Sequence, residues 1–486
     1  MTTPVPSRSG VPPPDRLGVP LPDRPRLRLA GSDVLSPLVT GELRPYVNFD
    51  YAASAPPLQA VVDALAAVTP WYSSVHRGAG FKSQVSTAAY EGARAVVREF
   101  VRAGPEHEVI FTRNTTDSVN LLASALPEGT RVITFLTEHH ANMLPWRRTE
   151  VTHLPVPPSP EALLEALRAE LQRVATPGGV LVAVTGASNV TGERWPLAEI
   201  GALAHARGAR VFVDAAQLAP HGAIDMAGME LDYLALSGHK LYAPYGAGVL
   251  VGRPDWLEGR APFLRGGGAV QFVTADAVSW APLPDRQEAG SPNVLGAVAI
   301  GVAMRELLTY GLPRIAAAEE RLQHLLRERL LAIPGLEWYT AWAPDHPRVG
   351  LMTFNLRGLD YGLVAAILSA EYGIGVRHGC FCAHPLLLHL MHVSGADADQ
   401  IRAEMGRGDR RRVPGAVRVS LGLGSAADDI EYLAEALARI VAKGPNWTYR
   451  RSPISGDYEP DPDPRSWPDL GIQLAGHGST ALGESS

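Results

Sequence analysis

Short apolar runs alternate with helical patterns through the middle of the chain, and this alternation constrains the fold more than any other feature. Each run is followed by polar or glycine residues, and the runs occupy residues 108–113, 131–136, 179–186, 209–216 and 231–237. Strands that alternate with helices form a mainly parallel sheet whose two faces are covered by helices. The pattern therefore predicts an α/β fold, with candidate sites at the carboxyl ends of these strands.

Two long helical stretches, residues 293–311 and 313–333, predict a connection to a second domain. Eight prolines among the first 25 residues disfavour regular structure there, and the acidic, proline-rich C-terminal end has a similar composition. We therefore expect a flexible tail, a large domain that contains the parallel sheet, a smaller C-terminal α+β domain and a second flexible tail. Their expected ranges are 1–40, 41–305, 306–445 and 446–486.

Charge and composition argue against several classes of function. The formal net charge of −6 predicts no basic face, so nucleic acid is not an expected partner. No run of about 18 apolar residues predicts a membrane span, and the N-terminus lacks the apolar core of a signal peptide. The two cysteines, Cys380 and Cys382, cannot make a disulfide framework, which is typical of a cytoplasmic protein.

Lys240 and Asp214 are the first candidates for chemistry, because each lies at the end of a predicted buried strand. A desolvated lysine amine is a nucleophile suited to a Schiff base, and a nearby carboxylate can hold a pyridinium nitrogen. Pyridoxal phosphate requires this combination, so the sequence predicts that cofactor and no metal site. The alternative is a lysine whose amine reaches the surface along its aliphatic stem.

Polar residues near other strand ends extend this candidate site. Thr115 opens a helix whose free N–H groups suit a phosphate, although helix capping is an ordinary role for threonine. His139 could stack on a flat ring, although a lone histidine is more often structural. Asn189 ends another strand, and Arg418 enters an apolar strand, where a buried arginine needs an anion such as a carboxylate.

The two cysteines stand one residue apart in the stretch VRHGCFCAHPLL, residues 376–387. Two thiols in a glycine-flanked polar turn favour a chemical role, whereas inert packing is the alternative. The order of the motifs along residues 46–443 resembles the class V, fold-type I pyridoxal-phosphate enzymes, and among them the Suf-type (group II) cysteine desulfurases and selenocysteine lyases. The resemblance rests on YAASAP, SSVHRG, TRNTTDSVN, EHHAN, SNVTG, VDAAQ, SGHKLYAPYGAGVL, EAGSPN, RHGCFCAHP and VRVSL.

The resemblance implies a role for each matching residue. Lys240 would be the Schiff-base lysine, Asp214 would pair with the pyridine nitrogen, and Gln217 would bind the ring oxygen. His139 would stack on the ring. The other implied contacts are the phosphate ligands Thr115, Ser237 and His239, the ligand Ser291 for the phosphate of the partner subunit, the substrate-carboxylate ligands Asn189 and Arg418, and Arg77, which lies in a motif that approaches the site.

The activity that the resemblance implies is conversion of L-cysteine to L-alanine, with the sulfur passed to a persulfide on Cys382. It also implies a cysteine-like substrate, a homodimer and a sulfur-acceptor protein. Cys380 stands where relatives often have histidine, and residues 393–414 form a longer segment than expected, so the substrate and the role of Cys380 stay open. The alternatives are an aminotransferase, C–S lyase or epimerase of secondary metabolism that uses the cofactor without a persulfide, and a scaffold protein without cofactor.

Overall fold

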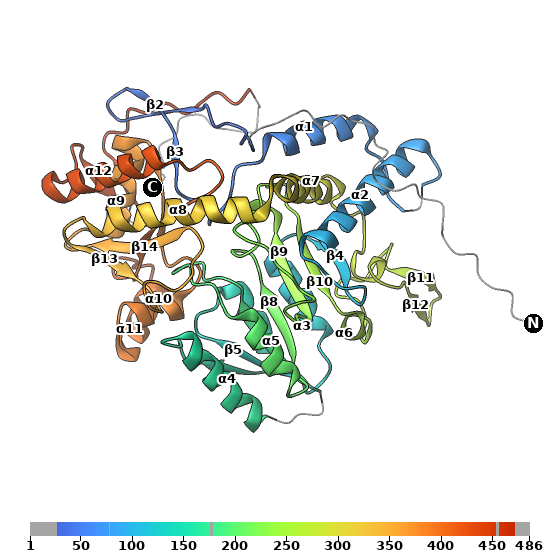
Figure 1. Ribbon diagram of the computed structural model, residues 1–486. Helices are drawn as coiled ribbons and strands as arrows, with labels where there is room; N and C mark the ends of the chain where they lie inside the picture. The colour runs from blue at the N-terminus through green and yellow to red at the C-terminus, as the bar shows by residue number, and fades with distance from the viewer. Residues whose placement is uncertain (1–26, 77, 175–177, 453–455, 472–486) are drawn as a thin grey trace, which may run out of the picture.

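The structure, a computed structural model, describes residues 27–76, 78–174, 178–452 and 456–471 (Figure 1). Its main sheet has seven strands in the order β4-β10-β9-β8-β7-β5-β6. In that order they are Glu108–Thr112, Gly248–Gly252, Tyr233–Ser237, Arg210–Asp214, Val180–Thr185, Arg131–Phe135 and Glu150–Leu154. Only β10 runs antiparallel to its neighbours in this sheet, so the prediction of a mainly parallel sheet is confirmed.

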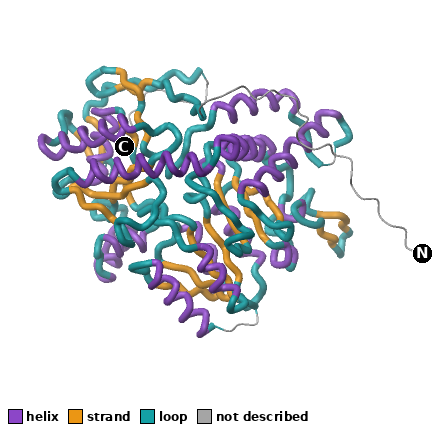
Figure 2. Tube along the Cα trace, in the orientation of Figure 1, coloured by secondary structure: helices purple, strands orange, loops and turns teal. Residues whose placement is uncertain are grey.

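Helices cover both faces of the main sheet (Figure 2). Side chains alternate between the faces along each strand, so Val211 and Val213 of β8 join one core cluster while Phe212 joins the other. The first cluster includes α1 (Gln59–Val68), α2 (Phe81–Phe100), α4 (Pro160–Arg173), α5 (Leu197–His205) and α7 (Val294–Tyr310). The second includes α3 (Thr115–Ala125) and α6 (Pro254–Glu258). This two-sided burial explains why the strands are continuous apolar runs.

A second, antiparallel sheet has the strand order β13-β14-β17-β16. Its strands are Leu336–Tyr339, Leu351–Leu356, Ala416–Ser420 and Arg377–Gly379, and it shares a core with α8 (Leu312–Leu331), α9 (Tyr361–Tyr372) and α12 (Ala427–Lys443). Helix α8 connects the two bodies, because Leu312 packs in the main core and Leu330 in the second. The smaller α+β part of the predicted fold is thus confirmed.

The remaining elements are short or lie at the periphery. They are β1 (Leu35–Pro37), β2 (Leu43–Pro45), β3 (Val47–Asn48), β11 (Val270–Val273), β12 (Val278–Trp280), β15 (Ile374–Gly375), β18 (Tyr449–Arg451), β19 (Tyr458–Pro460), α10 (His384–Leu390) and α11 (Gly395–Gly406). Among the described residues no single helix is long and apolar enough to cross a membrane, and only α7 and α8 together, bent by 80°, pass that test.

Regular structure is present in the described parts of the two segments, residues 1–40 and 446–486, that were expected to be flexible tails. Residues 1–26 and 472–486 lie outside the described chain, but β1 pairs with β2, and β18 pairs with β19. Glu371 of α9 accepts hydrogen bonds from the backbone N–H of Asn446 and from the hydroxyl of Tyr449. Contacts with a distant helix order this end, and local composition cannot reveal such contacts.

Candidate active site

The carboxyl edge of the main sheet brings several predicted residues together. Asp214 ends β8, and Ser237 ends the neighbouring strand β9. Lys240 follows in the 3-10 helix η5 (Gly238–Lys240), and His139 caps η3 (His140–Asn142) after β5. The site therefore lies where the topology of a parallel sheet predicts it.

Lys240 has the properties of an amine held ready for chemistry. Its Nζ makes no hydrogen bond and no ion pair within the described part of the chain. Burial, and then the guanidinium of Arg418, lower the pKa of Lys240 to about 8, against the opposing charge of Asp214. Burial raises the pKa of Asp214, while the N–H of Ala216, 3.0 Å from Oδ1, favours the carboxylate. A lysine with this pKa can exchange a proton near neutral pH.

His139 and Gln217 present further polar groups at this edge. The Nδ1 atom of His139 accepts a hydrogen bond from the N–H of Ala141 at 3.0 Å. Burial, and then the charge of Lys240, lower the pKa of His139 to about 3, so the imidazole stays neutral. Gln217 is buried and donates from Nε2 to the carbonyl of Ala52 at 2.7 Å, while its Oε1 has no hydrogen-bond partner among the described residues. This oxygen is therefore available to accept a hydrogen bond from a ligand or from an ordered water molecule.

Thr115 and Ser237 are in hydrogen-bond contact with each other at the N-terminus of α3. The N–H of Thr115 donates to Ser237 Oγ at 2.9 Å, and the two hydroxyl oxygens are 2.7 Å apart. Gly248 lets β10 approach closely, because a Cβ there would lie 2.6 Å from the Cα of Asn114. Burial lowers the pKa of His239, two residues after Ser237, to about 4. Hydroxyl groups at the N-terminus of a helix, where the helix dipole is positive, suit a phosphate.

Arg418 and Asn189 meet at the boundary between the two bodies. Arg418 is 3% exposed in β17, and its Nη1 donates to the carbonyl of Asn189 at 2.7 Å. Burial lowers the pKa of Arg418 to about 10, which still leaves it cationic. Its Nε has no hydrogen-bond partner among the described residues, and its ion pair with Asp50 is long, at 3.7 Å. The guanidinium thus retains capacity for an additional anion.

The turn that contains Cys380 and Cys382, called the cysteine turn below, contacts Asn189 and has a strained backbone conformation. Phe381 and Cys382 have φ values of 54° and 55°, which cost non-glycine residues roughly 1–2 kcal/mol each. Two long-range bonds hold the turn: Asn189 Nδ2 donates to the Phe381 carbonyl at 2.7 Å, and the His140 N–H donates to the Cys382 carbonyl at 2.8 Å. Such strain persists only where surrounding contacts fix the backbone.

The two thiols have different surroundings. Cys382 is exposed and lies within electrostatic reach of Lys240 and Arg418. Cys380 is half-buried, packs beside the cluster around Phe381, and lies within electrostatic reach of Tyr361 instead. The thiol that can meet a substrate bound between Lys240 and Arg418 is therefore that of Cys382.

One described residue among those predicted, Ser291, does not lie in this group, and the prediction missed two residues that do. Ser291 is exposed and lines a separate hollow, and Arg77 lies outside the described residues. Asp50 lies near Arg418, and Glu138 is fully buried beside Asp214 with its pKa raised by burial to about 8. Glu138 directly precedes the two histidines of EHHAN, and Asp50 directly precedes YAASAP. Nothing in the local sequence distinguishes either residue from an ordinary polar residue.

Comparison with known proteins decides the family. A model of the family described as "Aminotransferase class-V" matches residues 47–433. The chain belongs to the class-V aminotransferase family. A "Cysteine desulfurase" of Dickeya dadantii is 36% identical over 423 residues, which cover 84% of this chain and 94% of that protein. A "Cysteine desulfurase" of Klebsiella pneumoniae is 34% identical over 420 residues, which cover 84% of this chain and 96% of that protein.

Solved structures resemble this class-V chain as well. The apo structure of a cysteine desulfurase from Thermococcus onnurineus NA1 has a TM-score of 0.72 at 30% identity, and the match covers 82% of this chain and 95% of that one. The "cysteine desulfurase CsdA (S-sulfonic acid)" of Escherichia coli gives 0.67 at 32% identity with the same coverage. The fold-type I assignment of this class-V aminotransferase is thus confirmed.

The geometry of this class-V aminotransferase chain defines what it can bind. A low-pKa amine, a buried carboxylate, a neutral imidazole and a helix N-terminus surround one edge of the sheet. These groups could hold a flat, phosphorylated carbonyl compound with a basic ring nitrogen. Arg418 adds a buried cation, and Cys382 adds an exposed thiol within electrostatic reach of Lys240.

Proposed function

We propose that this chain is a pyridoxal-phosphate-dependent cysteine desulfurase that acts as a homodimer in the cytoplasm. The observation that carries the proposal is the position of Cys382, an exposed thiol within electrostatic reach of both Lys240 and Arg418. An aminotransferase needs the lysine and the arginine but has no use for a thiol between them. The names of the relatives support the same activity.

The residues present fit the cofactor. Lys240 offers an amine without a hydrogen-bond partner within the described chain, Asp214 offers a buried carboxylate, and Gln217 offers an unsatisfied Oε1. Thr115, Ser237 and His239 would hold the phosphate, and the neutral His139 would stack on the ring. When bound, pyridoxal phosphate supplies an electron sink for the pair left at the substrate Cα.

The side chains of this protein would then perform four tasks. Arg418 and Asn189 bind the substrate carboxylate, and Lys240 takes and returns the Cα proton. Cys382, as thiolate, attacks the substrate sulfur: an S–S bond forms while the substrate C–S bond breaks, and the carbon keeps the electron pair and gains a proton. L-Cysteine and one enzyme thiol thus give L-alanine and one enzyme persulfide, which a sulfur-acceptor protein would discharge.

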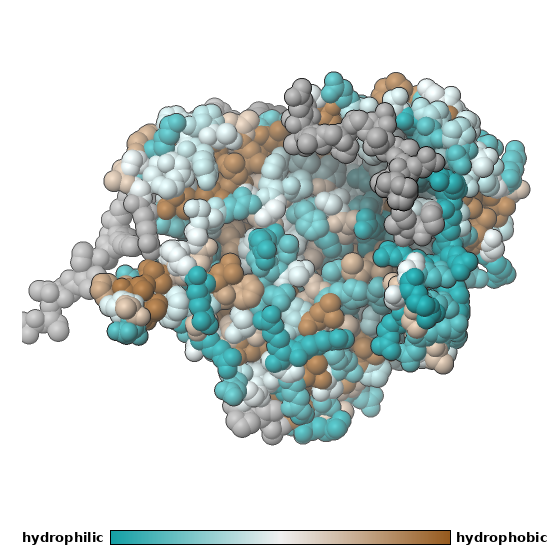
Figure 3. All heavy atoms as spheres, turned by 180° about the vertical axis from the view of Figure 1, so that it is seen from behind, coloured by the Kyte–Doolittle hydropathy of each residue, from teal (hydrophilic) through white to brown (hydrophobic). Residues whose placement is uncertain are grey.

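The surface around Ser291 supports a dimer. Ser291, Tyr72 and the glycines that lead into β11 line a hollow of about 320 Å³. The β11–β12 hairpin beside it exposes Phe272 by 66%, and Figure 3 shows hydrophobic side chains gathered on this lobe at the left edge of the view. Contiguous exposed apolar residues mark association surfaces. A second copy would cover the hairpin and could bring Ser291 to the phosphate of its partner.

The test is to incubate the holoenzyme with a panel of amino acids and to identify the products by mass. The proposal predicts L-alanine from L-cysteine, together with sulfide when a reductant is present. Pyruvate and ammonia from L-cysteine would identify a lyase instead. An amino-group transfer or an inverted Cα would identify an aminotransferase or an epimerase, and each of these outcomes would replace the desulfurase proposal.

A further inference from the structure

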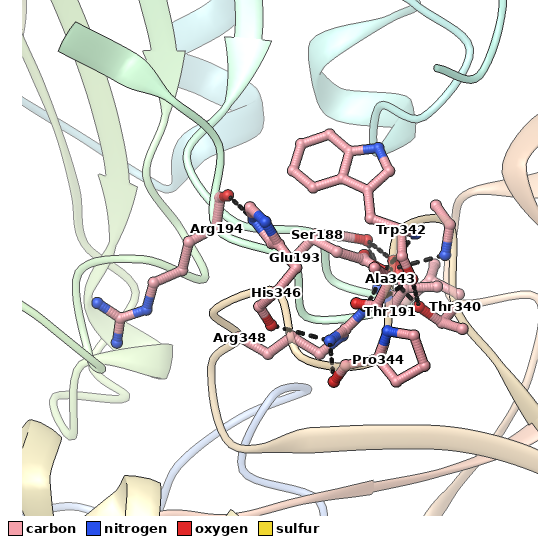
Figure 4. A network of polar contacts seen from close by, with 12 residues as sticks. Ser188, Thr191, Glu193, Arg194, Thr340, Trp342, Ala343, Pro344, His346 and Arg348 are labelled. Atoms are coloured by element: carbon pink, nitrogen blue, oxygen red, sulfur yellow. Dashed lines mark hydrogen bonds and ion pairs between the residues drawn. The ribbon is translucent and has the colours of Figure 1, made fainter. Parts of the chain in front are cut away.

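Glu193 and Arg348 form a buried ion pair that the chemistry above does not use. Glu193 is 1% exposed and Arg348 8%, and Arg348 Nη2 lies 3.3 Å from Glu193 Oε1 (Figure 4). Arg348 also donates to Thr340 Oγ1 and to the carbonyls of Trp342, Ala343, Pro344 and His346. Apolar residues of similar volume often stabilise a core as well as such a pair does, so stability alone does not account for it.

The pair ties a turn of the main body to a loop of the second body. Glu193 Oε1 accepts from the Ala341 N–H at 2.9 Å and from Thr340 Oγ1 at 3.0 Å. On both sides of Glu193 the backbones join directly: the Val349 N–H donates to the Gly192 carbonyl at 2.9 Å, and the Arg194 N–H to the Pro347 carbonyl at 3.0 Å. The two segments therefore move as one unit.

The turn itself has little freedom between Ser188 and Gly192. Ser188 Oγ accepts from the N–H of Val190 at 3.2 Å and from the N–H and the hydroxyl of Thr191 at 3.1 and 2.8 Å. The Ser188 N–H donates to the Glu193 carbonyl at 3.0 Å, and Gly192 has a φ of +81°, which suits glycine. A displacement of Glu193 is thus transmitted along the turn.

Asn189 stands in this turn and makes both contacts that organise the site. Its carbonyl accepts from Arg418 Nη1 at 2.7 Å, and its Nδ2 donates to the carbonyl of Phe381 at 2.7 Å. Asn189 therefore fixes the position of Arg418 relative to the strained turn of Cys382. An amide nitrogen has two hydrogens, so Asn189 can also bind a substrate carboxylate while it holds Phe381.

We infer that Glu193 and Arg348 are positioning residues: by fixing the turn of Asn189, they keep Arg418 and Cys382 at the spacing that one amino-acid substrate spans. The inference rests on the proposed function for its substrate. It predicts two effects when the pair is weakened, a lower affinity for the substrate and a looser cysteine turn. The cofactor site should be unaffected, because Lys240 lies in η5 and Asp214 lies in β8, outside the turn.

The experiment compares Glu193→Gln with Asp232→Asn in the holoenzyme. Asp232 is also buried and ion-paired, with Arg253 at 2.8 Å, but it lies at the opposite, amino end of the β9 strand. For Glu193→Gln we expect the KM for L-cysteine to rise about 10-fold or more, because even a small displacement of the groups that position a substrate has a large effect. We also expect faster amide hydrogen exchange in residues 379–384, with the cofactor absorption maximum unchanged. Asp232→Asn should change neither.

The inference is overturned if both variants keep the wild-type KM and exchange rate, or if both change alike. Should Glu193→Gln fail to fold, Thr340→Val removes one hydroxyl from the same network and Arg348→Lys keeps its charge without the planar fork. Faster exchange in residues 379–384 is expected from each of them. Hydrogen exchange decides the positioning role even if the wild type forms no alanine, so failure of the proposed function remains distinguishable.

Discussion

The amine of Lys240 should lose its proton at a lower pH than an exposed lysine does, because burial lowers its pKa. An amine reacts in its neutral form, and burial lowers the pKa of Lys240 from 10.5 to about 8. In the apoprotein, acylation of Lys240 should therefore accelerate with pH and level off just above pH 8. Peptide mass mapping can follow this, with the exposed Lys82 and Lys443 as references in the same sample. A rate for Lys240 that still rises between pH 9 and 10 would refute the assigned environment.

Asp214→Asn keeps the shape of the side chain and removes its charge. The Ala216 N–H can still donate to the amide oxygen, so the local backbone should persist. Removal of one preorganised group that stabilises charge in the transition state lowers kcat by about 100- to 1,000-fold, so we expect a fall of at least about 100-fold. Steady-state alanine formation measures kcat, and absorption of the bound cofactor is the control. Wild-type turnover by this variant would show that the charge has no role.

Single residues differ in how far their sequence context reveals them. Lys240 and Asp214 follow apolar strands, so the rule that sites form at the ends of parallel strands found both. Glu138 and Asp50 gain their surroundings from chain segments that are distant in sequence: Glu138 accepts from the Thr185 N–H, and Asp50 lies near Arg418. No local pattern encodes such contacts, which is why the sequence alone did not identify them.

At the scale of elements, the C-terminal hairpin β18–β19 should stabilise the fold. Glu371 of α9 accepts hydrogen bonds from Asn446, Trp447 and Tyr449. A chain that ends at residue 444 should lose roughly 1–3 kcal/mol of unfolding free energy, because these bonds to a carboxylate disappear. Denaturant unfolding measures the loss, and a chain that ends at residue 471 is the matched control. Equal unfolding free energies for the two chains would show that the hairpin does not stabilise the fold.

Elements were predicted correctly where the spacing of apolar residues and the composition indicate the same structure, and others were missed. The five apolar runs became β4, β5, β7, β8 and β9. β10 was not predicted, although it follows β9 after a connection too short for the crossover that a parallel neighbour requires. Its antiparallel direction follows from that short connection. The pairing of β3 with β15 spans more than three hundred residues, so no local signal predicts it.

At the scale of the whole molecule, the β11–β12 hairpin tests the proposed dimer. Phe272 is 66% exposed there, and Phe272→Asp should convert the dimer to a monomer by placing a charge in an apolar contact. Light scattering after size exclusion gives the mass of the assembly. Val34 is also an exposed apolar residue, at 57%, and it lies beside the β1–β2 ribbon, far from the hairpin in Figure 1, so Val34→Asp should leave the mass unchanged. A Phe272→Asp protein that remains dimeric would exclude this surface.

The central claim, that Cys382 receives the sulfur of L-cysteine, is tested most directly by peptide mass mapping after a single turnover without reductant. We expect one added sulfur atom on Cys382, in the wild type and in Cys380→Ser alike, because Cys380 lies within electrostatic reach of Tyr361 and not of Lys240. Cys382→Ser should carry no added sulfur and form no alanine. Alanine formation by Cys382→Ser at the wild-type rate, or added sulfur found only on Cys380, would show that Cys382 is not the sulfur acceptor.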